Sequence, residues 1–469
     1  MKRILAALFG VLLLLAPGAA AQQSSPPASN PPPLNAPSAE FLKTADQVLA
    51  EMSALLSLPV KSPLQKSLRT REEIRDYLIR RMKEDKEPAK RYADQKLLEK
   101  FGLIPRGFQL EPFLVELLTE QIAGLYDPKS QEFFIADWIS PADQRMVMAH
   151  ELTHALHDQH FKAEAWLDAA KPNDDAELAR EAVMEGSALA AMVDYLLRER
   201  KLGVRDLPDL EQFVRGQLGE LDKSPQLAKA PPFLRDALIF PYLAGTAFTQ
   251  RFLRAHSGWA DFHKVFENPP ASTQQILHPD LYLSGTTPKP LALPDFSRLV
   301  PAGWNKLDEN VLGEFGLLEL LKQFLGEERA RRLAPSWAGD RYAIFDHGKT
   351  RQLLLVFRLR LASDADAARF FGGYSEALEL KYDKRRELFR RPNYFSFESE
   401  ECGVFLRCVA DQCFSVEGAS REVFDRITRA IGWPPGPSWR PVPDRPPHRT
   451  TITTVIAPPP STAELVPLP

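Results

Sequence analysis

Hydrophobic residues recur at two different periods along this chain. Up to about residue 305 they mostly return every three or four positions, a spacing that predicts amphipathic helices. Two short apolar runs on either side of the turn-like Pro-Lys-Ser-Gln at 128–131 instead predict a β-hairpin. The predicted helical regions are residues 39–100, 143–160, 176–197 and 234–256, the last interrupted near Pro241 and Gly245, and the predicted hairpin strands are 122–127 and 132–137.

From about residue 307 shorter elements of both kinds follow one another. Strands are predicted at 341–346, 352–361, 394–399, 404–408 and 413–416, and helices at 313–325, 364–382 and 421–431. This mixture predicts a compact second domain. The fold class expected of the whole chain is therefore α+β: a mainly helical domain with a small edge hairpin or sheet, followed by a smaller α+β domain.

The N-terminus predicts export. Lys2 and Arg3 precede an apolar run at residues 4–16, and Ala19-Ala20-Ala21 offers a small-residue cleavage site, as in a signal peptide. The run is shorter than the roughly 20 residues of a membrane span, so we expect no stable membrane insertion after cleavage and a periplasmic or extracellular protein. The predicted order is a signal peptide (1–21), a Pro/Ser-rich linker (22–38), a first domain (39–305), a second domain (306–433) and a Pro-rich flexible tail (434–469).

The composition and net charge of the chain limit the classes of partner that it is expected to bind. The 469 residues are 44% hydrophobic, which is enough for two sizeable cores. A formal net charge of -3 predicts no nucleic-acid partner and no anionic-membrane partner, and the oligomeric state stays open. Cys402, Cys408 and Cys413 lie near the C-terminus of a chain expected in an oxidising compartment. Cys408 and Cys413 flank a predicted hairpin turn, but Cys402 can pair with either, and any pairing within the chain leaves one thiol over.

The most specific motif is His150-Glu151-Leu152-Thr153-His154. On a helix, residues four apart lie on one face, so both imidazoles can bind one zinc ion, Zn2+, with Glu151 beside a metal-bound water. A zinc hydrolase needs a third protein ligand and an open position for water. The apolar side of this helix is expected to face a core and the histidines a cleft.

Two residues compete for the third position. His160 lies six residues after His154, as in the metzincin pattern His-Glu-x-x-His-x-x-Gly-x-x-His, but His157 stands where metzincins have the glycine. Glu185 lies in the next long helix, in the middle of the apolar stripe that includes Leu178, Leu189, Met192 and Leu196. A buried carboxylate needs a partner, which a metal ion supplies, although an Arg or His would also serve. Glu181, one turn earlier, ranks behind Glu185 as a ligand.

His-Glu-x-x-His on one helix, followed by a glutamate in a Glu-Gly-Ser-Ala context on the next long helix, resembles the gluzincin branch of zinc metallopeptidases. The resemblance covers about residues 124–195. It implies a zincin-like first domain, His150, His154 and Glu185 as zinc ligands, and Glu151 as general base. In zincins an edge strand beside the active-site helix binds extended peptide, and residues 132–137 are a candidate for that strand, with an ordinary core-covering hairpin as the equal alternative.

The sequence therefore predicts an exported zinc peptidase that acts on a peptide or protein. Glu151 would take a proton from the metal-activated water as it attacks the peptide carbonyl. A Tyr or His often stabilises the oxyanion in gluzincins, and His278 is the candidate chosen here, although no spacing rule separates it from Tyr242 or Tyr282. The alternatives are a metzincin-like peptidase that uses His160, and an inactive secreted binding or scaffold protein with a zincin fold.

Overall fold

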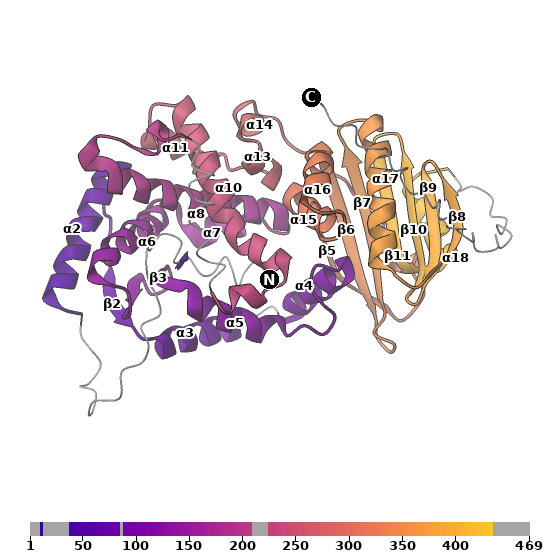
Figure 1. Ribbon diagram of the computed structural model, residues 1–469, viewed down its shortest axis with the longest axis horizontal. Helices are drawn as coiled ribbons and strands as arrows, with labels where there is room; N and C mark the ends of the chain where they lie inside the picture. The colour runs from indigo at the N-terminus through magenta and orange to yellow at the C-terminus, as the bar shows by residue number, and fades with distance from the viewer. Residues whose placement is uncertain (1–9, 13–36, 85–87, 209–223, 435–469) are drawn as a thin grey trace, which may run out of the picture.

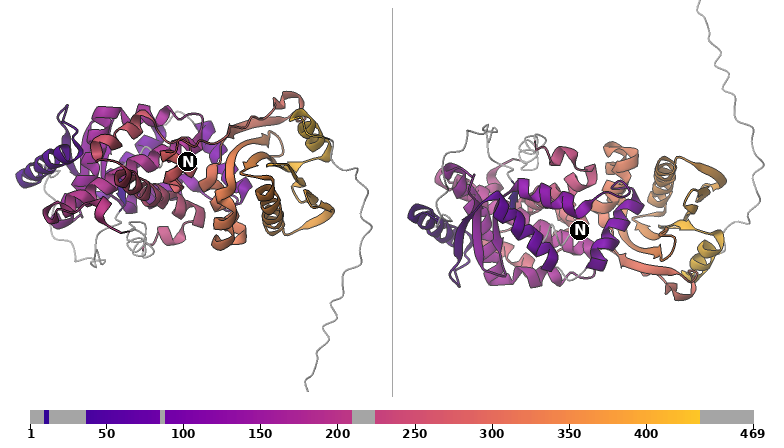
Figure 2. Two further views of the ribbon diagram at one scale, coloured as in Figure 1. Left: turned by 90° about the horizontal axis from the view of Figure 1, so that it is seen from above. Right: turned by 90° about the horizontal axis from the view of Figure 1, so that it is seen from below.

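The computed structural model describes residues 10–12, 37–84, 88–208 and 224–434 (Figure 1). The predicted signal peptide, linker and tail lie outside the described residues, apart from residues 10–12, 37–38 and 434. Views from above and from below, each at a right angle to that of Figure 1, show a helical half at one end of the molecule and a sheet-rich half at the other (Figure 2). The predicted α+β class is confirmed.

The first half contains a four-stranded sheet and most of the helices. Its elements are β1 (Gly10–Leu12), α2 (Ala39–Leu56), β2 (Gln65–Arg69), α3 (Arg71–Glu84), α4 (Pro88–Phe101), α5 (Leu110–Gln121), β3 (Ile122–Asp127), β4 (Glu132–Ala136), α6 (Pro141–Phe161), α7 (Ala163–Asp168), α8 (Asp174–Leu197), α10 (Pro232–Ala255), α11 (Trp259–Phe262), α12 (Lys264–Glu267), α13 (Thr273–Leu277) and α14 (Pro279–Leu283). Helix α6 packs against β3 and β4 as well as against α8, and α8 in turn packs along α10. Because α6 contacts both the sheet and α8, its residues 147–157 are all buried.

The hairpin is present, and of the two alternatives for residues 132–137 the edge strand is wrong. The strand order is β1-β3-β4-β2, so β4 lies inside the sheet. Strand β2 covers β4 by parallel pairing, with Leu68 opposite Ile135. The sequence did not reveal β2, because Gln-Lys-Ser-Leu-Arg has no alternation of apolar residues and is ordered by its pairing. An extended peptide therefore finds no free backbone on β4.

The second half is an antiparallel sheet of seven strands in the order β5-β6-β7-β11-β10-β9-β8. Its elements are β5 (Trp304–Asn310), α15 (Gly313–Leu325), α16 (Glu327–Leu333), β6 (Trp337–His347), β7 (Leu353–Leu361), α17 (Asp364–Lys381), β8 (Arg385–Arg391), β9 (Tyr394–Ser399), β10 (Cys402–Val409), β11 (Gln412–Ala419) and α18 (Arg421–Ala430). Alternate residues of β7 enter two cores: Leu355 and Phe357 join the core shared with the first half, whereas Leu354 and Val356 join the core under α18.

Other expectations need smaller corrections. Helix α10 is continuous although it contains Pro241, which lies within its buried stretch against α8. Leu196 is 47% exposed and does not belong to the apolar stripe of α8. Cys408 and Cys413 face each other across β10 and β11 and form a disulfide, and Cys402 is free. In the part of the chain that the structure describes, no helix combines the length and the apolar character that crossing a membrane requires.

Candidate metal centre

Helices α6 and α8 carry the two motifs that the sequence singled out, and polar caps fix where each helix begins. The Ser140 hydroxyl accepts the backbone N–H of Asp143 at the start of α6. At the start of α8, the Asn173 side chain accepts the N–H groups of Asp175 and Ala176. Such caps stabilise a helix start by about 1 kcal/mol. The packing of α6 against α8 brings the ligand candidates of the two helices together.

Three donor atoms converge between these helices. The Nε2 atoms of His150 and His154 lie 3.0 Å apart. A carboxylate oxygen of Glu185 lies 3.2 Å from the first and 3.4 Å from the second. Zinc bonds of about 2.0–2.1 Å at tetrahedral angles separate neighbouring ligand atoms by about 3.3–3.4 Å. The three atoms therefore span one face of a zinc tetrahedron, so these residues fit the metal and leave a fourth position.

Burial and mutual contact set the protonation of this group. His150 and His154 are at most 1% exposed and Glu185 is 7% exposed, so the site is more enclosed than the predicted open cleft. Burial lowers the pKa of His150 to about 4. Burial alone would raise the pKa of Glu185, but the two imidazoles outweigh it and the pKa falls to about 2. A neutral imidazole and an ionised carboxylate are the forms that bind zinc.

Glu151 lies beside this group, under β3. It is fully buried, and its carboxylate accepts the backbone N–H of Tyr126 at 2.9 Å. Strand and helix approach closely because residue 124 is glycine: a Cβ there would lie 2.5 Å from Val147 Cγ1 and 3.3 Å from Glu151 Cγ. The strand thereby holds the carboxylate one residue away from the ligand His150, where a general base is needed.

Tyr242 of α10 packs against the ligand candidates. Its ring lies over that of His150, with centroids 6.2 Å apart and planes at 26°. Burial, and then the charge and hydrogen bond of the Glu185 carboxylate, raise the pKa of Tyr242 well above the ordinary value, so its hydroxyl is protonated. Two glycines allow this approach, because a Cβ on Gly186 would lie 1.9 Å from the carbonyl carbon of Gly245. The sequence analysis chose His278, and the pair Gly186 and Gly245 is the signal that could have directed the choice to Tyr242.

The remaining predicted site residues lie elsewhere. His160, near the end of α6, bonds through Nε2 to the Pro59 carbonyl oxygen at 2.8 Å. His278 pairs through Nε2 with Glu314 Oε1 at 2.7 Å, so its side chain is directed to α15 and the structure does not bring it to the metal centre. Glu181 is buried but stands outside the converging group, one turn from Glu185. His157 packs its buried ring against Phe266, with centroids 4.9 Å apart.

A second group of ligand-type atoms occurs in the described part of the chain: the carboxylates of Asp94, Asp174 and Asp308. Here an ammonium is the common partner. Lys90 Nζ lies 2.9 Å from Asp94, 3.1 Å from Asp174 and 2.8 Å from Asp308. Because the lysine already supplies the cation, this group joins α4, α8 and β5 as an ion-pair network.

Comparison with known proteins agrees with the placement of the first group. Residues 115–213, which include all three ligand candidates, match the family model Peptidase_M78, described as an IrrE N-terminal-like domain. Residues 298–427 match a domain of unknown function, DUF8575. No curated protein matches the chain. A crystal structure from Chloroflexus aurantiacus, described as a candidate hydrolase with a novel fold, is 15% identical with a TM-score of 0.33, covering 53% of this chain and 90% of that one. We infer nothing from so distant a likeness.

Proposed function

We propose that the zincin-like metallopeptidase domain of this chain, with its His150, His154 and Glu185 group, makes the protein an exported zinc-dependent peptidase. The observation that carries the proposal is the convergence of three donor atoms, 3.0 to 3.4 Å apart, beside a buried glutamate. A zinc ion held there would lower the pKa of a bound water and polarise a peptide carbonyl. A purely structural zinc site normally has four protein ligands. This group supplies three, which would leave the fourth position on the metal for water or substrate.

Glu151 is the proposed general base. It follows His150 on the ligand helix α6, and its carboxylate would take the proton of the attacking water and return it to the leaving amine. The Tyr126 N–H bond, 2.9 Å long, fixes one oxygen of this carboxylate. Tyr242 is the proposed oxyanion donor in place of His278, because its ring stacks over that of His150 and its hydroxyl is protonated.

The proposed peptide-binding strand is β3. Its outer edge already takes an extended segment: Gly10–Leu12 pairs with it antiparallel, Gly10 opposite Leu125 and Leu12 opposite Ile122. The same segment contacts α6. Residues 10–12 belong to the predicted signal peptide, so cleavage would free this edge in the mature protein. The pairing supports β3, and not the predicted residues 132–137, as the strand that adds a substrate by main-chain hydrogen bonds.

Export rests on two observations of different kinds. The sequence carries the basic, apolar and small-residue regions of a signal peptide within residues 1–21. The disulfide between Cys408 and Cys413 is a bond that persists in the periplasm or outside the cell. Together they support an oxidising compartment as the place where the peptidase acts.

The direct test is the zinc content of the purified mature protein, measured by elemental analysis beside three variants. We expect about one zinc per chain in the wild type, loss of zinc with Glu185→Ala, and unchanged zinc with His160→Ala and Glu181→Ala. Circular dichroism establishes that each variant is folded. Zinc lost with His160→Ala and kept with Glu185→Ala would move the site to the metzincin-like arrangement, and a folded wild type without zinc affinity would exclude the peptidase.

A peptide-library digest completes the test. The zinc-loaded wild type is expected to cleave peptides, and the matched Glu151→Gln variant is expected to keep its zinc and to cleave none measurably. Zinc binding without any cleavage in the wild type would favour a secreted binding protein with a zincin fold.

A further inference from the structure

A cavity of about 60 Å³ lies where the two halves of the molecule meet. Helices α4, α8 and α10 form its walls on one side, and α15 and β6 form them on the other. Its wall on α8 includes Leu178 and Glu181, and Glu181 is one turn, about 6 Å, before the ligand Glu185. Its wall on α10 includes Ala237, five residues before Tyr242. The cavity thus borders α8, which carries the ligand candidate Glu185, and α10, which carries Tyr242.

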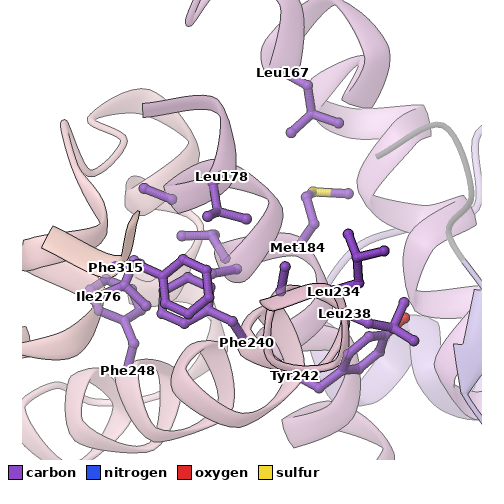
Figure 3. Close-up of a cluster of buried hydrophobic side chains, with 14 of the residues drawn as sticks. Leu167, Leu178, Met184, Leu234, Leu238, Phe240, Tyr242, Phe248, Ile276 and Phe315 are labelled. Atoms are coloured by element: carbon purple, nitrogen blue, oxygen red, sulfur yellow. The ribbon is translucent and has the colours of Figure 1, made fainter. Parts of the chain in front are cut away.

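The lining is mainly apolar. Side chains such as Leu98, Phe101, Leu178 and Phe315 face the space. Figure 3 shows Phe315 beside Phe240, with Leu178 close by, and the two rings have centroids 4.2 Å apart. Transfer of a ligand from water into such a cavity is therefore favourable when the ligand itself is apolar.

Acidic residues at the border do not change this preference. Asp94, Asp174 and Glu181 all line the cavity. Asp94 and Asp174 are each ion-paired with Lys90, at 2.9 and 3.1 Å, so their charge is compensated before any ligand enters. Glu181 also interacts with other groups of the fold.

The size sets a second limit. A buried water occupies about 10–15 Å³ on this scale, and an apolar cavity of about 150 Å³ holds benzene. A space of about 60 Å³ lies between these values. It fits the branched or linear end of an aliphatic side chain and excludes an aromatic ring.

We propose that this cavity binds an aliphatic side chain of the peptide substrate, of the size of Val, Leu or Met, and that the C-terminal domain supplies one wall of this specificity pocket. The inference rests on the proposed peptidase function and names a substrate class for it. It also gives the domain matched at 298–427 a role, because Val311, Phe315 and Tyr342 of that region line the pocket.

The experiment measures residue preference beside the cleaved bond with a peptide library, using zinc-loaded wild type and Ala237→Leu, which fills the cavity from α10. The wild type is expected to prefer Leu, Val or Met at one position. Ala237→Leu is expected to lower kcat/KM for those peptides by at least about tenfold, and to leave Ala or Gly peptides within about twofold. Ala255→Leu, the same change at the exposed end of the same helix, is the matched control.

A binding measurement separates the pocket from the chemistry. Uncleaved peptides that differ only in Leu or Ala at the preferred position are titrated into Glu151→Gln and into Glu151→Gln with Ala237→Leu. The preference for Leu is expected in the first and absent in the second. Val311→Leu, a milder filling from the C-terminal domain, should weaken the same preference, and it keeps the test decisive if Ala237→Leu does not fold.

Three results would overturn the inference. They are an unchanged preference in both cavity variants, a wild-type preference for Lys or Arg, and a wild-type preference for Phe or Trp. In each of these the wild type still binds zinc and cleaves peptide, so the pocket fails while the peptidase stands. Absence of zinc or of all cleavage is instead the failure of the proposed function itself.

Discussion

Two places in the described part of the chain bring ligand atoms of three side chains within 4.8 Å of one another, and they are built differently. At the metal centre, two imidazoles and one carboxylate converge, all of them buried. At the junction of α4, α8 and β5, three half-buried carboxylates surround the ammonium of Lys90. Although burial disfavours its charge, these carboxylates raise the pKa of Lys90 well above its ordinary value.

The difference teaches how to separate a metal site from an ion-pair network when both have convergent donors. The second cluster contains its own cation, because the raised pKa of Lys90 keeps the ammonium protonated. It joins three elements of the fold. The first contains two imidazole nitrogens and an ionised carboxylate oxygen, which lie 3.0 to 3.4 Å from one another. Such a set suits zinc, because nitrogen and oxygen donors at those separations match its tetrahedron.

The largest effect should come from Glu151, which distinguishes a reactive metal site from a merely occupied one. Glu151→Gln removes the proton acceptor but keeps the size and the bond to the Tyr126 N–H. We expect kcat to fall by about 10²- to 10⁴-fold with one zinc retained. Steady-state kinetics beside elemental analysis measure both quantities. Activity within tenfold of the wild type would remove Glu151 from the mechanism.

Tyr242→Phe is expected to have the next largest effect. The ring still stacks over His150, so zinc affinity should stay within about threefold, but the hydroxyl can no longer donate to an oxyanion. Loss of one such donor lowers kcat by about a hundredfold and changes KM little. A rise in KM with an unchanged kcat would mean that Tyr242 binds the substrate without assisting the reaction.

Removing the cation from the second cluster should make its carboxylates able to bind a metal ion, as the first cluster is proposed to do. Lys90→Gln leaves the three carboxylates facing one another, so we expect a loss of about 2 kcal/mol in unfolding free energy, measured by urea denaturation. Millimolar calcium, which prefers carboxylate oxygens, should restore part of this loss in the variant and have no effect on the wild type. Lys96→Gln is the matched control, since among the described residues Lys96 forms its ion pair with a single carboxylate, that of Glu99 on the same helix, at 2.7 Å. Equal losses in both variants would contradict the special role of the cluster.

Local patterns in the sequence were sufficient for the helices that carry the ligands. The expected spans 143–160 and 176–197 agree with α6 and α8 within two residues at each end, because both helices combine a polar cap with a long period of 3.6. Strand β8 was missed because Arg-Arg-Glu-Leu-Phe-Arg-Arg reads as a charged surface, and only pairing with β9 orders it. Non-local pairing likewise decided that β4 is an inner strand.

The same limit applies to the site. His150, His154 and Glu185 were found because spacing within one helix, and a carboxylate on an apolar face, are local signals. Tyr242 was named but not preferred over His278, since its position depends on how closely α8 and α10 cross, and that follows from Gly186 meeting Gly245. The amide that holds Glu151 is a backbone group, and no side-chain pattern can reveal it.

The smallest expected effect concerns His278, which forms a single half-exposed ion pair with Glu314. The hydrogen bond to Glu314 raises the pKa of His278, whose side chain is 39% exposed. The folded state therefore binds the proton more tightly than the unfolded one, with its pKa of about 6.5. The pair stabilises the fold fully below that pH, and its contribution disappears as the pH rises through the higher folded pKa. Solvent screening limits it to about 1 kcal/mol. Urea denaturation of the wild type and His278→Gln should thus differ at about pH 5.5 and converge at about pH 9, with kcat unchanged. A large loss of kcat with an intact stability curve would return His278 to the active site and weaken the case for Tyr242.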